Sequence, residues 1–331
     1  MKTFRWGIIG CGQIAPKFFH ALNNTGEGMA VAAASKSLRR AQRLQKKLGL
    51  QTVYGSYDEM LDTEQLDAVY IANTHAEHFA AAMRCLNRGL PVLVEKAFTR
   101  NAKEAEALIE LARRKNLFLM EAMWTRFNPA SAKVRELLTS GAIGRVIHFK
   151  ANFCVQMKRL SPKMFPWNRM YNPKLAGGAL LDVGVYPVAF ARMVFGAAPE
   201  KIVTKRIKMA FTGVDASEEF EFEYAGGIRA ELAASFRETR PRDAVITGTA
   251  GTIRVPHFSH TDDVILIRAG KAEHFKCEAN GFEHEIREVH RCMNAGLIES
   301  PLLTHAETLE TMRTMDTLRA QWCMKYPGEE N

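Results

Sequence analysis

The chain has 331 residues, of which 47% are hydrophobic and 24% are charged. These values are typical of an ordinary globular protein, and the length suits two domains. The formal net charge is +9, but the basic residues form no terminal arm and show no zinc-finger or basic-zipper spacing, so we expect no nucleic-acid partner.

The sequence also argues against a membrane or secreted protein. No apolar run approaches the ~20 residues needed to span a bilayer. The N-terminus leads directly into a short apolar segment, without the longer apolar stretch of a signal peptide. Six dispersed cysteines form no CxxC pair, and a chain of this length needs no disulfides. We therefore expect a cytoplasmic protein with reduced thiols and no membrane partner.

The first 120 residues alternate short apolar segments with amphipathic ones. The expected strands cover residues 6–9, 29–34, 68–73, 91–95 and 117–121. The expected helices cover about 14–22 and 38–48, open again at Ser56 and Asn101, and include one that ends near Gly89. This alternation predicts βαβ units, and hence a doubly wound parallel sheet of the Rossmann type over residues 1–122.

The pattern changes in residues 123–331. Helices are expected near 131–140, 182–195, 283–294 and 305–324, and a strand near 145–155. Residues 201–267 alternate apolar and polar side chains between glycine-containing turns, which predicts a large, mostly antiparallel open sheet. The fold class is therefore α/β, with an N-terminal Rossmann domain and a C-terminal α+β domain. The last helix is free to pack back on the first domain.

A glycine-rich turn follows the first expected strand and opens the first helix. It reads Gly10-Cys11-Gly12-Gln13-Ile14-Ala15, a G-x-G-x-x-A element. Gly10 permits a tight turn, Gly12 lets the backbone approach a pyrophosphate, and Ala15 allows close helix packing. The N–H groups at the helix start then face the phosphates. We interpret this element as a dinucleotide-binding site.

The end of the second strand indicates which dinucleotide is bound. An acidic residue there would hydrogen-bond the ribose of NAD. This chain instead has Ser35 and Lys36, with Arg40 close behind, and no acid among residues 36–47. Hydroxyl and guanidinium groups suit a 2′-phosphate. We therefore expect NADP, with NAD less favoured, and interpret the remaining basic residues of this segment as a solvated helix face.

Two further places carry groups suited to hydride-transfer chemistry. Lys96 ends a parallel strand, at the edge where doubly wound sheets bind ligands, although an exposed charge there is the alternative. Asp182 and Tyr186 are four residues apart and share a face on a helix, although Tyr186 could also be an ordinary core residue. A nearby ammonium favours the phenolate, so one Lys–Tyr pair can serve both oxidation and reduction.

These motifs, in this order, resemble the Gfo/Idh/MocA oxidoreductases. The likeness rests on the Gly10–Ala15 turn, the Glu95-Lys96 pair and the Gly177–Tyr186 stretch, and it continues through residues 248–254 and 299–301. Residues 120–129, together with Tyr186, are most similar to the branch of dimeric dihydrodiol dehydrogenases and NADP-dependent sugar dehydrogenases.

The resemblance implies an NADP-dependent dehydrogenase or reductase acting on CH–OH groups of a sugar, a trans-diol or a related small polyol. It implies that Lys96 hydrogen-bonds the nicotinamide ribose and the reacting oxygen. Tyr186 would give or take the proton, and Asp182 would place the substrate or the tyrosine. A non-catalytic NADP-binding regulator of the same fold is the alternative, and the presence of both Lys96 and Tyr186 argues against it.

The resemblance also assigns cofactor contacts beyond the glycine turn. Ser35 and Arg40 would grip the 2′-phosphate, and Asn73, Thr74 and His75 would line the cofactor cleft. We add Glu95 and His78 to this set. His75 and His78 have a spacing that two metal ligands could use, but no third ligand is evident, so we expect no metal site.

Two departures from the family pattern stand out. Ala97 replaces the proline that commonly follows the lysine, and Tyr186 stands where many members have histidine.

The loop at residues 158–178 is expected to set the substrate. Nearby aromatic and basic residues are candidates for the pocket wall, with core or structural roles equally open: Trp124, Arg126, Phe127, Phe153, Phe165, Trp167 and Arg169.

The open sheet of the family often mediates oligomerisation. Residues 201–267 are expected to present an apolar sheet face that needs a cover, so we expect a homodimer or a larger even-numbered homo-oligomer.

Overall fold

The computed structural model describes residues 3–157, 168–278 and 281–329. The chain divides into two compact units. The first comprises Met1–Trp124 and Phe282–Leu309, and the second comprises Thr125–Gly281 and Glu310–Asn331. The expected division at residue 122 allowed only the last helix to return to the first domain, whereas residues 282–309, including helix α8 (Phe282–Asn294), belong to the first unit. The return occurs because α8 packs along helix α1 (Ala15–Thr25) of the first unit.

The first unit contains a six-stranded parallel sheet in the order β3-β2-β1-β4-β5-β6. Its strands are β1 (Phe4–Ile9), β2 (Gly28–Ala34), β3 (Thr52–Tyr54), β4 (Ala68–Ile71), β5 (Val92–Glu95) and β6 (Leu119–Ala122). This is the strand order of a dinucleotide-binding Rossmann sheet, and the order reverses between β1 and β4, where such sheets bind their ligand. The predicted Rossmann domain is confirmed.

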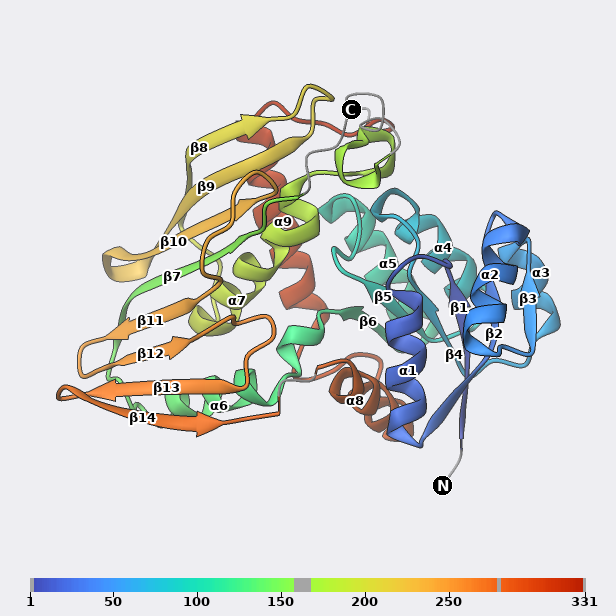
Figure 1. Ribbon diagram of the computed structural model, residues 1–331, viewed down its shortest axis with the longest axis horizontal. Helices are drawn as coiled ribbons and strands as arrows, with labels where there is room; N and C mark the ends of the chain where they lie inside the picture. Colours follow the sequence, from blue (N-terminus) through green and yellow to red (C-terminus); the bar gives the residue numbers. More distant parts are fainter. Residues whose placement is uncertain (1–2, 158–167, 279–280, 330–331) are drawn as a thin grey trace. The chain divides into compact units, whose positions relative to one another are not determined.

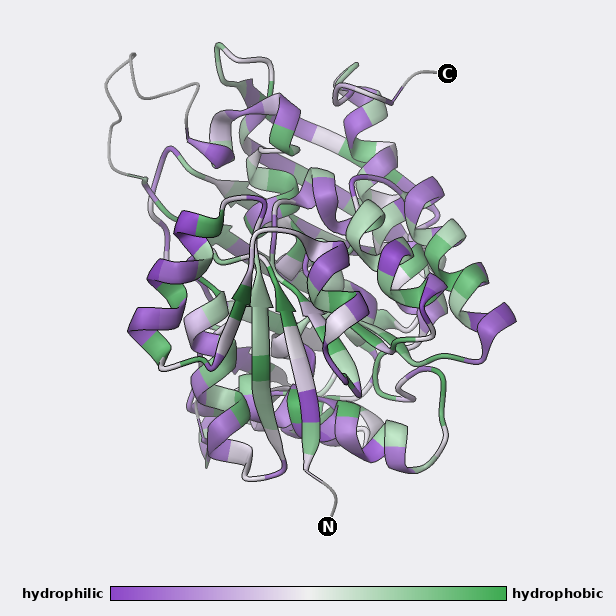
Figure 2. Cartoon of the chain, turned by 90° about the vertical axis from the view of Figure 1, so that its right-hand side faces the viewer, coloured by the Kyte–Doolittle hydropathy of each residue, from purple (hydrophilic) through white to green (hydrophobic). Residues whose placement is uncertain are grey.

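Helices cover both faces of this sheet. They are α1, α2 (Leu38–Leu48), α3 (Tyr57–Thr63), α4 (His75–Asn87), α5 (Ala102–Lys115) and α8. α1 lies beside α8, and α4 lies beside α5 (Figure 1). In Figure 2 the strands of this unit are mainly hydrophobic, whereas the surrounding helices carry alternating hydrophilic and hydrophobic residues. This is the pattern of a sheet buried on both faces.

The helix ends follow the local signals of the sequence. Ser56 accepts a hydrogen bond from the Glu59 N–H, and Asn101 accepts one from the Glu104 N–H at 2.9 Å. Gly49 ends α2 in the left-handed conformation, with φ of 70°. These caps satisfy backbone groups that a helix terminus leaves unpaired.

The second unit contains an eight-stranded sheet in the order β14-β13-β12-β11-β7-β10-β9-β8. Its strands are β7 (Val146–Cys154), β8 (Lys201–Met209), β9 (Asp215–Tyr224), β10 (Ile228–Ser235), β11 (Ala244–Gly248), β12 (Thr252–Val255), β13 (Asp263–Arg268) and β14 (Lys271–Lys276). β7 and β10 pair in parallel, and the other neighbours pair antiparallel. The predicted mostly antiparallel sheet is confirmed, and β14 extends it beyond the expected end at residue 267.

The helices of the second unit are α6 (Pro129–Thr139), α7 (Val185–Phe195) and most of α9 (His305–Gln321). A π-helical turn, η5 (Leu180–Gly184), leads directly into α7. Short 3₁₀ turns occur at η1 (Trp124–Arg126), η3 (Arg169–Tyr171), η4 (Pro173–Leu175) and η6 (Ala225–Gly227). The regular helix expected from residue 182 therefore begins only at Val185.

The two faces of the eight-stranded sheet differ in chemistry. One face is apolar, with buried Phe149, Phe222 and Ile253, and α7 and α6 of the same chain pack against the sheet. The other face carries ion pairs such as Lys150–Glu231, with a 3.0 Å separation between Nζ and Oε2. The apolar face thus has its cover within the unit, so it supplies no reason for a partner, and the oligomeric state stays a prediction.

One helical stretch, Pro173–Phe195, is long and apolar enough to cross a bilayer by length and composition. However, 78% of its most apolar window is buried inside the structure. Burial of this extent is what a core helix of a folded domain shows.

Candidate active site

The glycine turn after β1 is shaped by a close approach of two strand ends. Gly10 has φ of +103°, and a Cβ there would lie 2.5 Å from the carbonyl carbon of Ala72. A side chain is therefore excluded on steric and conformational grounds. A Cβ on Gly12 would meet only the carbonyl oxygen of Ala72, at 3.8 Å. The turn thus leaves open space beside Gly12, which suits the approach of a pyrophosphate.

The first helix begins at this turn without a side-chain cap. Ile14 precedes α1 and makes no capping hydrogen bond, and the turn has no acidic residue. The first N–H groups of a helix have no partner within the helix, and they attract anions. Ala15 is fully buried, as close packing of the helix start requires. The backbone from Gly10 through Gln13 to Ala15 therefore fits a dinucleotide phosphate.

The end of β2 carries the groups expected to select the cofactor. Ser35 is buried, and its hydroxyl accepts a hydrogen bond from the Ser37 N–H at 3.2 Å. Arg40 is exposed in the first turn of α2. Lys36 forms an ion pair with Glu77 of α4, so its charge is shared with a carboxylate. Ser35 and Arg40 are consequently better suited than Lys36 to bind a phosphate.

Tyr57 is a neighbour of this region that the sequence analysis overlooked. Burial, followed by the charge of Glu77, raises the pKa of its phenol. A hydrogen bond with Asn73 lowers this pKa, and the charge of Cys11 raises it. The phenol therefore stays protonated at neutral pH. The only local signal for Tyr57 was its place directly after the Ser56 cap.

Three buried polar atoms lie between the end of β4 and the first turn of α4. They are Asn73 Oδ1, Thr74 Oγ1 and His78 Nε2, which have no hydrogen-bond partner within the described part of the chain. Buried polar groups in folded proteins are nearly always paired. A bound polar molecule would pair them, so these three atoms support a ligand site beside the Gly10–Gly12 turn.

His78 and His75 lie at the start of α4, with ring centroids 5.6 Å apart. The Nδ1 atom of His78 lies 2.9 Å from the carbonyl oxygen of Ala97. Burial, with a contribution from His75, lowers the pKa of His78 to about 3, so the ring is neutral at physiological pH. No third potential ligand joins this pair among the residues that the structure describes.

Lys96 directly follows β5, at the carboxyl edge of the parallel sheet. The preceding Glu95 is buried and accepts hydrogen bonds from the Tyr70 hydroxyl and from the Lys96 N–H. The Glu95 carboxylate therefore bonds within the unit and holds the backbone of Lys96. The peptide bond from Lys96 to Ala97 is cis.

Two more buried carboxyl groups lie near Glu95, and the sequence analysis did not identify them. Glu121 of β6 accepts hydrogen bonds from the Phe98 N–H at 3.2 Å and from the Thr308 hydroxyl at 3.3 Å. Burial raises the pKa of Glu121 to about 7. Burial, with Glu95 and Glu121, also raises the pKa of Glu285 well above its ordinary value. Their distant positions in the sequence gave no signal that they meet.

In the second unit, Asp182 lies in the π-helical turn and Tyr186 in the first turn of α7, and both are buried. Nη1 and Nη2 of Arg169 each lie 3.2 Å from Asp182 Oδ1. The ring of Tyr186 stacks on Phe153, with centroids 5.1 Å apart. Arg169 and Phe153 thus contact the predicted catalytic residues of this unit.

The glycine-rich segment before Tyr186 is held from three sides. Asp215 Oδ2 accepts the Leu180 N–H at 2.5 Å, and a Cβ on Gly178 would clash with the other Asp215 oxygen. The Tyr326 hydroxyl donates to the Gly177 carbonyl at 2.7 Å. A Cβ on Gly184 would lie 3.1 Å from Leu180 Cδ1 and 3.2 Å from the Cβ of Ala234. These contacts explain why the segment is rich in glycine.

Of the remaining candidates, Trp124 stacks on Phe282 inside the first unit, with centroids 5.4 Å apart, and Phe127 is buried in the second. The Arg126 carbonyl accepts a hydrogen bond from Arg135. Phe165, Trp167 and the rest of residues 158–167, the first part of the predicted specificity loop, lie outside the described residues.

The sequence matches family models in both units. The family model described as "Oxidoreductase family, NAD-binding Rossmann fold" matches residues 4–123, and the "GFO/IDH/MocA C-terminal domain" matches residues 131–254. The chain belongs to the GFO/IDH/MocA oxidoreductase family. The predicted family and the predicted oxidoreductase class are confirmed.

Individual relatives agree with this membership. The chain is 33% identical to a trans-1,2-dihydrobenzene-1,2-diol dehydrogenase of Danio rerio, covering 98% of each chain. KijD10, a 3-ketoreductase from Actinomadura kijaniata solved with NADP and TDP-benzene, is 26% identical, with a TM-score of 0.84 and coverage of 96% of this chain and 98% of that one. An aldose-aldose oxidoreductase from Caulobacter crescentus has a TM-score of 0.85 at 18% identity over 96% and 97% of the chains, and shows the fold alone.

Proposed function

We propose that this oxidoreductase transfers a hydride between NADP(H) and a CH–OH carbon of a trans-diol, a sugar or a related small polyol. One observation carries the proposal. Lys96 stands at the carboxyl end of β5, and the neighbouring strand β4 is followed by Asn73 and Thr74, whose buried oxygens have no partner among the described residues. The names of the dihydrodiol dehydrogenase and ketoreductase relatives support the substrate class.

The preference for NADP over NAD is part of the proposal. It is supported by Ser35 and the exposed Arg40, and by the lack of an acid where NAD-binding sheets place one. A guanidinium can bind a 2′-phosphate through two hydrogen bonds. The NADP bound by KijD10 agrees with this preference.

For the chemical step we propose Tyr186 as the acid–base group. NADP⁺, when bound, supplies the hydride acceptor. During oxidation of an alcohol, the hydroxyl proton passes to the Tyr186 oxygen, and during reduction the neutral phenol gives a proton to the new alkoxide. Asp182, fixed by Arg169, would place the substrate or the phenol. Lys96 would hydrogen-bond the reacting oxygen and favour the phenolate.

We further propose that Glu95 acts indirectly, by holding the backbone at Lys96 through its bond to the Lys96 N–H. His75 and His78 would line the cofactor site from the start of α4. The proposal also includes a homodimer or larger even-numbered oligomer, supported by the family resemblance, and a cytoplasmic location, supported by six free cysteines.

The test is a screen of trans-diols, aldoses and dicarbonyl compounds, followed by the absorbance of NADPH. We expect turnover with at least one class. If the protein binds NADPH tightly but none of these compounds changes its oxidation state, the non-catalytic regulator becomes the better description.

A further inference from the structure

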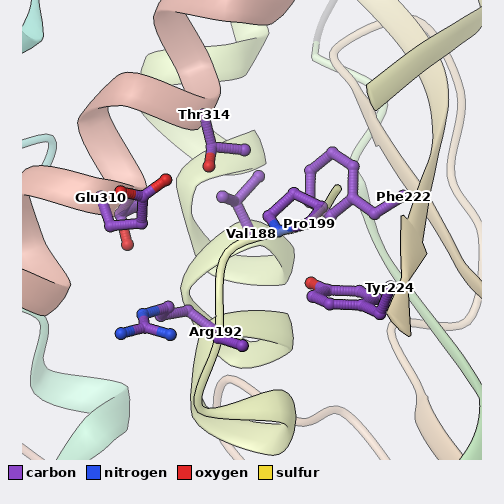
Figure 3. Close-up of a pocket in the computed structure, with 9 residues that line it drawn as sticks. Val188, Arg192, Pro199, Phe222, Tyr224, Glu310 and Thr314 are labelled. Carbon is purple, nitrogen blue, oxygen red and sulfur yellow. The ribbon is translucent and has the colours of Figure 1, made fainter. Parts of the chain in front are cut away.

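A small pocket lies within the second unit, between α7, β9 and α9 (Figure 3). Its volume of about 10 Å³ has room for about one water-sized group. None of its residues belongs to the proposed cofactor or catalytic set. The lining consists of Val188, Arg192, Ala197, Pro199, Phe222, Tyr224, Glu310, Thr311 and Thr314.

The pocket contains a partly buried cation, Arg192, which has no ion-pair partner among the described residues. Nε and Nη1 of Arg192 are buried and have no hydrogen-bond partner within residues 3–157, 168–278 and 281–329. Figure 3 shows the Arg192 side chain extending from α7 toward the helix that carries Glu310 and Thr314. The residue as a whole is only partly buried, but buried N–H groups such as these two normally have a hydrogen-bond partner.

The other polar groups of the pocket include hydroxyl donors. Thr314 is buried, and Tyr224 is a buried phenol that interacts electrostatically with Arg192. Burial raises the pKa of Tyr224, so its O–H remains a donor at neutral pH. Hydroxyls beside a guanidinium form the usual environment of a bound anion.

Glu310 is the one carboxylate in the lining, and it would oppose an anion. No ion pair joins it to Arg192 among the described residues. It is also the natural competitor, because a rotation of its side chain could pair it with Arg192. Arg192 therefore has two possible partners, a bound anion or the Glu310 carboxylate, and a substitution of Glu310 distinguishes them.

We propose that this pocket binds one small monovalent anion, of halide size or the end of a single carboxylate, through one of the two unpaired N–H groups of Arg192. The Nε–H and Nη1–H bonds of a guanidinium point in different directions, so the anion would accept from one of them, and the small volume excludes larger anions. The bound anion would stabilise the packing of α7 on β9 and α9, because a ligand that binds only the folded state stabilises it. The site does not depend on the proposed enzymatic function.

The test is thermal unfolding of the full-length protein at constant ionic strength, with a bulky sulfonate replaced stepwise by chloride or by acetate. We expect a saturable rise in Tm of about 2–4 °C, as a modest stabilisation of a domain of this size would give. A response to either anion supports the site and shows which chemistry it takes. A response to neither overturns the proposal.

Variants make the test specific. Arg192→Met should abolish the response, and Arg229→Met, which removes an exposed arginine of β10, should leave it unchanged. If Arg192→Met does not fold, Arg192→Lys keeps the charge but loses the planar guanidinium and its Nε–H, and should bind the anion at least threefold more weakly. An anion response that survives both substitutions would mean nonspecific ion effects and would refute the site.

Glu310→Gln distinguishes a bound anion from Glu310 itself as the partner of Arg192. If the pocket binds an anion, removing the opposing carboxylate should tighten binding at least threefold. If Glu310 is instead the true partner of Arg192, Glu310→Gln should lower Tm in the bulky sulfonate, and the wild-type protein should show no anion response. The second result would overturn the proposal.

Discussion

The Nδ1 atom of His78 lies 2.9 Å from the carbonyl oxygen of Ala97, the residue that follows Lys96. A histidine at the start of α4 therefore holds the segment that leaves β5. The pKa of His78 is lowered to about 3, chiefly by burial, so the ring donates from Nδ1 as a neutral group. This bond couples the cofactor end of the sheet to the position of Lys96.

The first prediction concerns this histidine and pH. The unfolded chain binds a proton at His78 below its ordinary pKa of about 6.5, whereas the folded chain does not until about pH 3. The free energy of unfolding should therefore fall as pH falls through this window, by about 2 kcal/mol between pH 6.5 and 5. His78→Asn keeps a donor but cannot titrate, so it should lack this loss.

The measurement is denaturant unfolding at pH 5 to 8, with His20→Asn as an exposed control. Buried Glu121, whose pKa is raised to about 7, acts in the opposite sense, because its stabilising protonated form is lost as pH rises. The quantity to compare is therefore the difference in the free energy of unfolding between His78→Asn and the wild type at each pH. An identical pH dependence in both would contradict the role of His78.

The second prediction concerns cofactor choice. NADP should bind at least tenfold more tightly than NAD, a gap of about 1.4 kcal/mol. Arg40→Ala should shrink this gap while leaving NAD binding nearly unchanged, because only the 2′-phosphate loses a contact. Arg43→Ala, on the exposed part of the same helix, is the matched control. Calorimetric titration with both cofactors checks the prediction, and equal binding constants in the wild type would refute it.

The third prediction concerns the acid–base group. Tyr186→Phe keeps the ring that stacks on Phe153 and removes only the hydroxyl, so folding and NADP affinity should survive. Turnover should fall by about 10²–10⁴, the usual cost of losing a positioned acid or base. Tyr54→Phe is the control, since its hydroxyl bonds Glu64 in the first unit. Wild-type turnover in Tyr186→Phe would show that another group moves the proton.

Lys96→Met should also lower turnover, and it should weaken NADP binding because the proposed ribose contact is lost. The two variants therefore differ in cofactor affinity. Steady-state kinetics with the best substrate of the screen, together with NADP titration, would separate them.

The fourth prediction concerns Asp215, which accepts the Leu180 N–H at the start of the π-helical turn. Asp215→Ala would leave that buried N–H unpaired, at a cost of about 1–3 kcal/mol in the free energy of unfolding. Because the turn carries Asp182, kcat should fall while NADP affinity stays unchanged. Glu231→Ala, which removes a surface pair with Lys150, is the control. Unchanged unfolding and kcat would exclude this supporting role.

Much of the backbone was predictable because its causes are local. The glycine turn at Gly10 and the caps at Ser56 and Asn101 depend on residues a few positions apart. The strand–helix alternation of the first unit likewise follows from the spacing of hydrophobic residues within short segments. The proposal of Ser35 and Arg40 as cofactor contacts also rests on local information, namely their position after β2, and it stays a prediction.

Other features depend on partners far apart in the chain, and only the tertiary structure decided them. Glu77 pairs with Lys36, and Glu285 comes near Glu121, because packing of separate helices and strands brings them together. The return of α8 to the first unit and the parallel pairing of β7 with β10 have no local signature. Periodicity specifies which face of an element is apolar, but not which other element covers it.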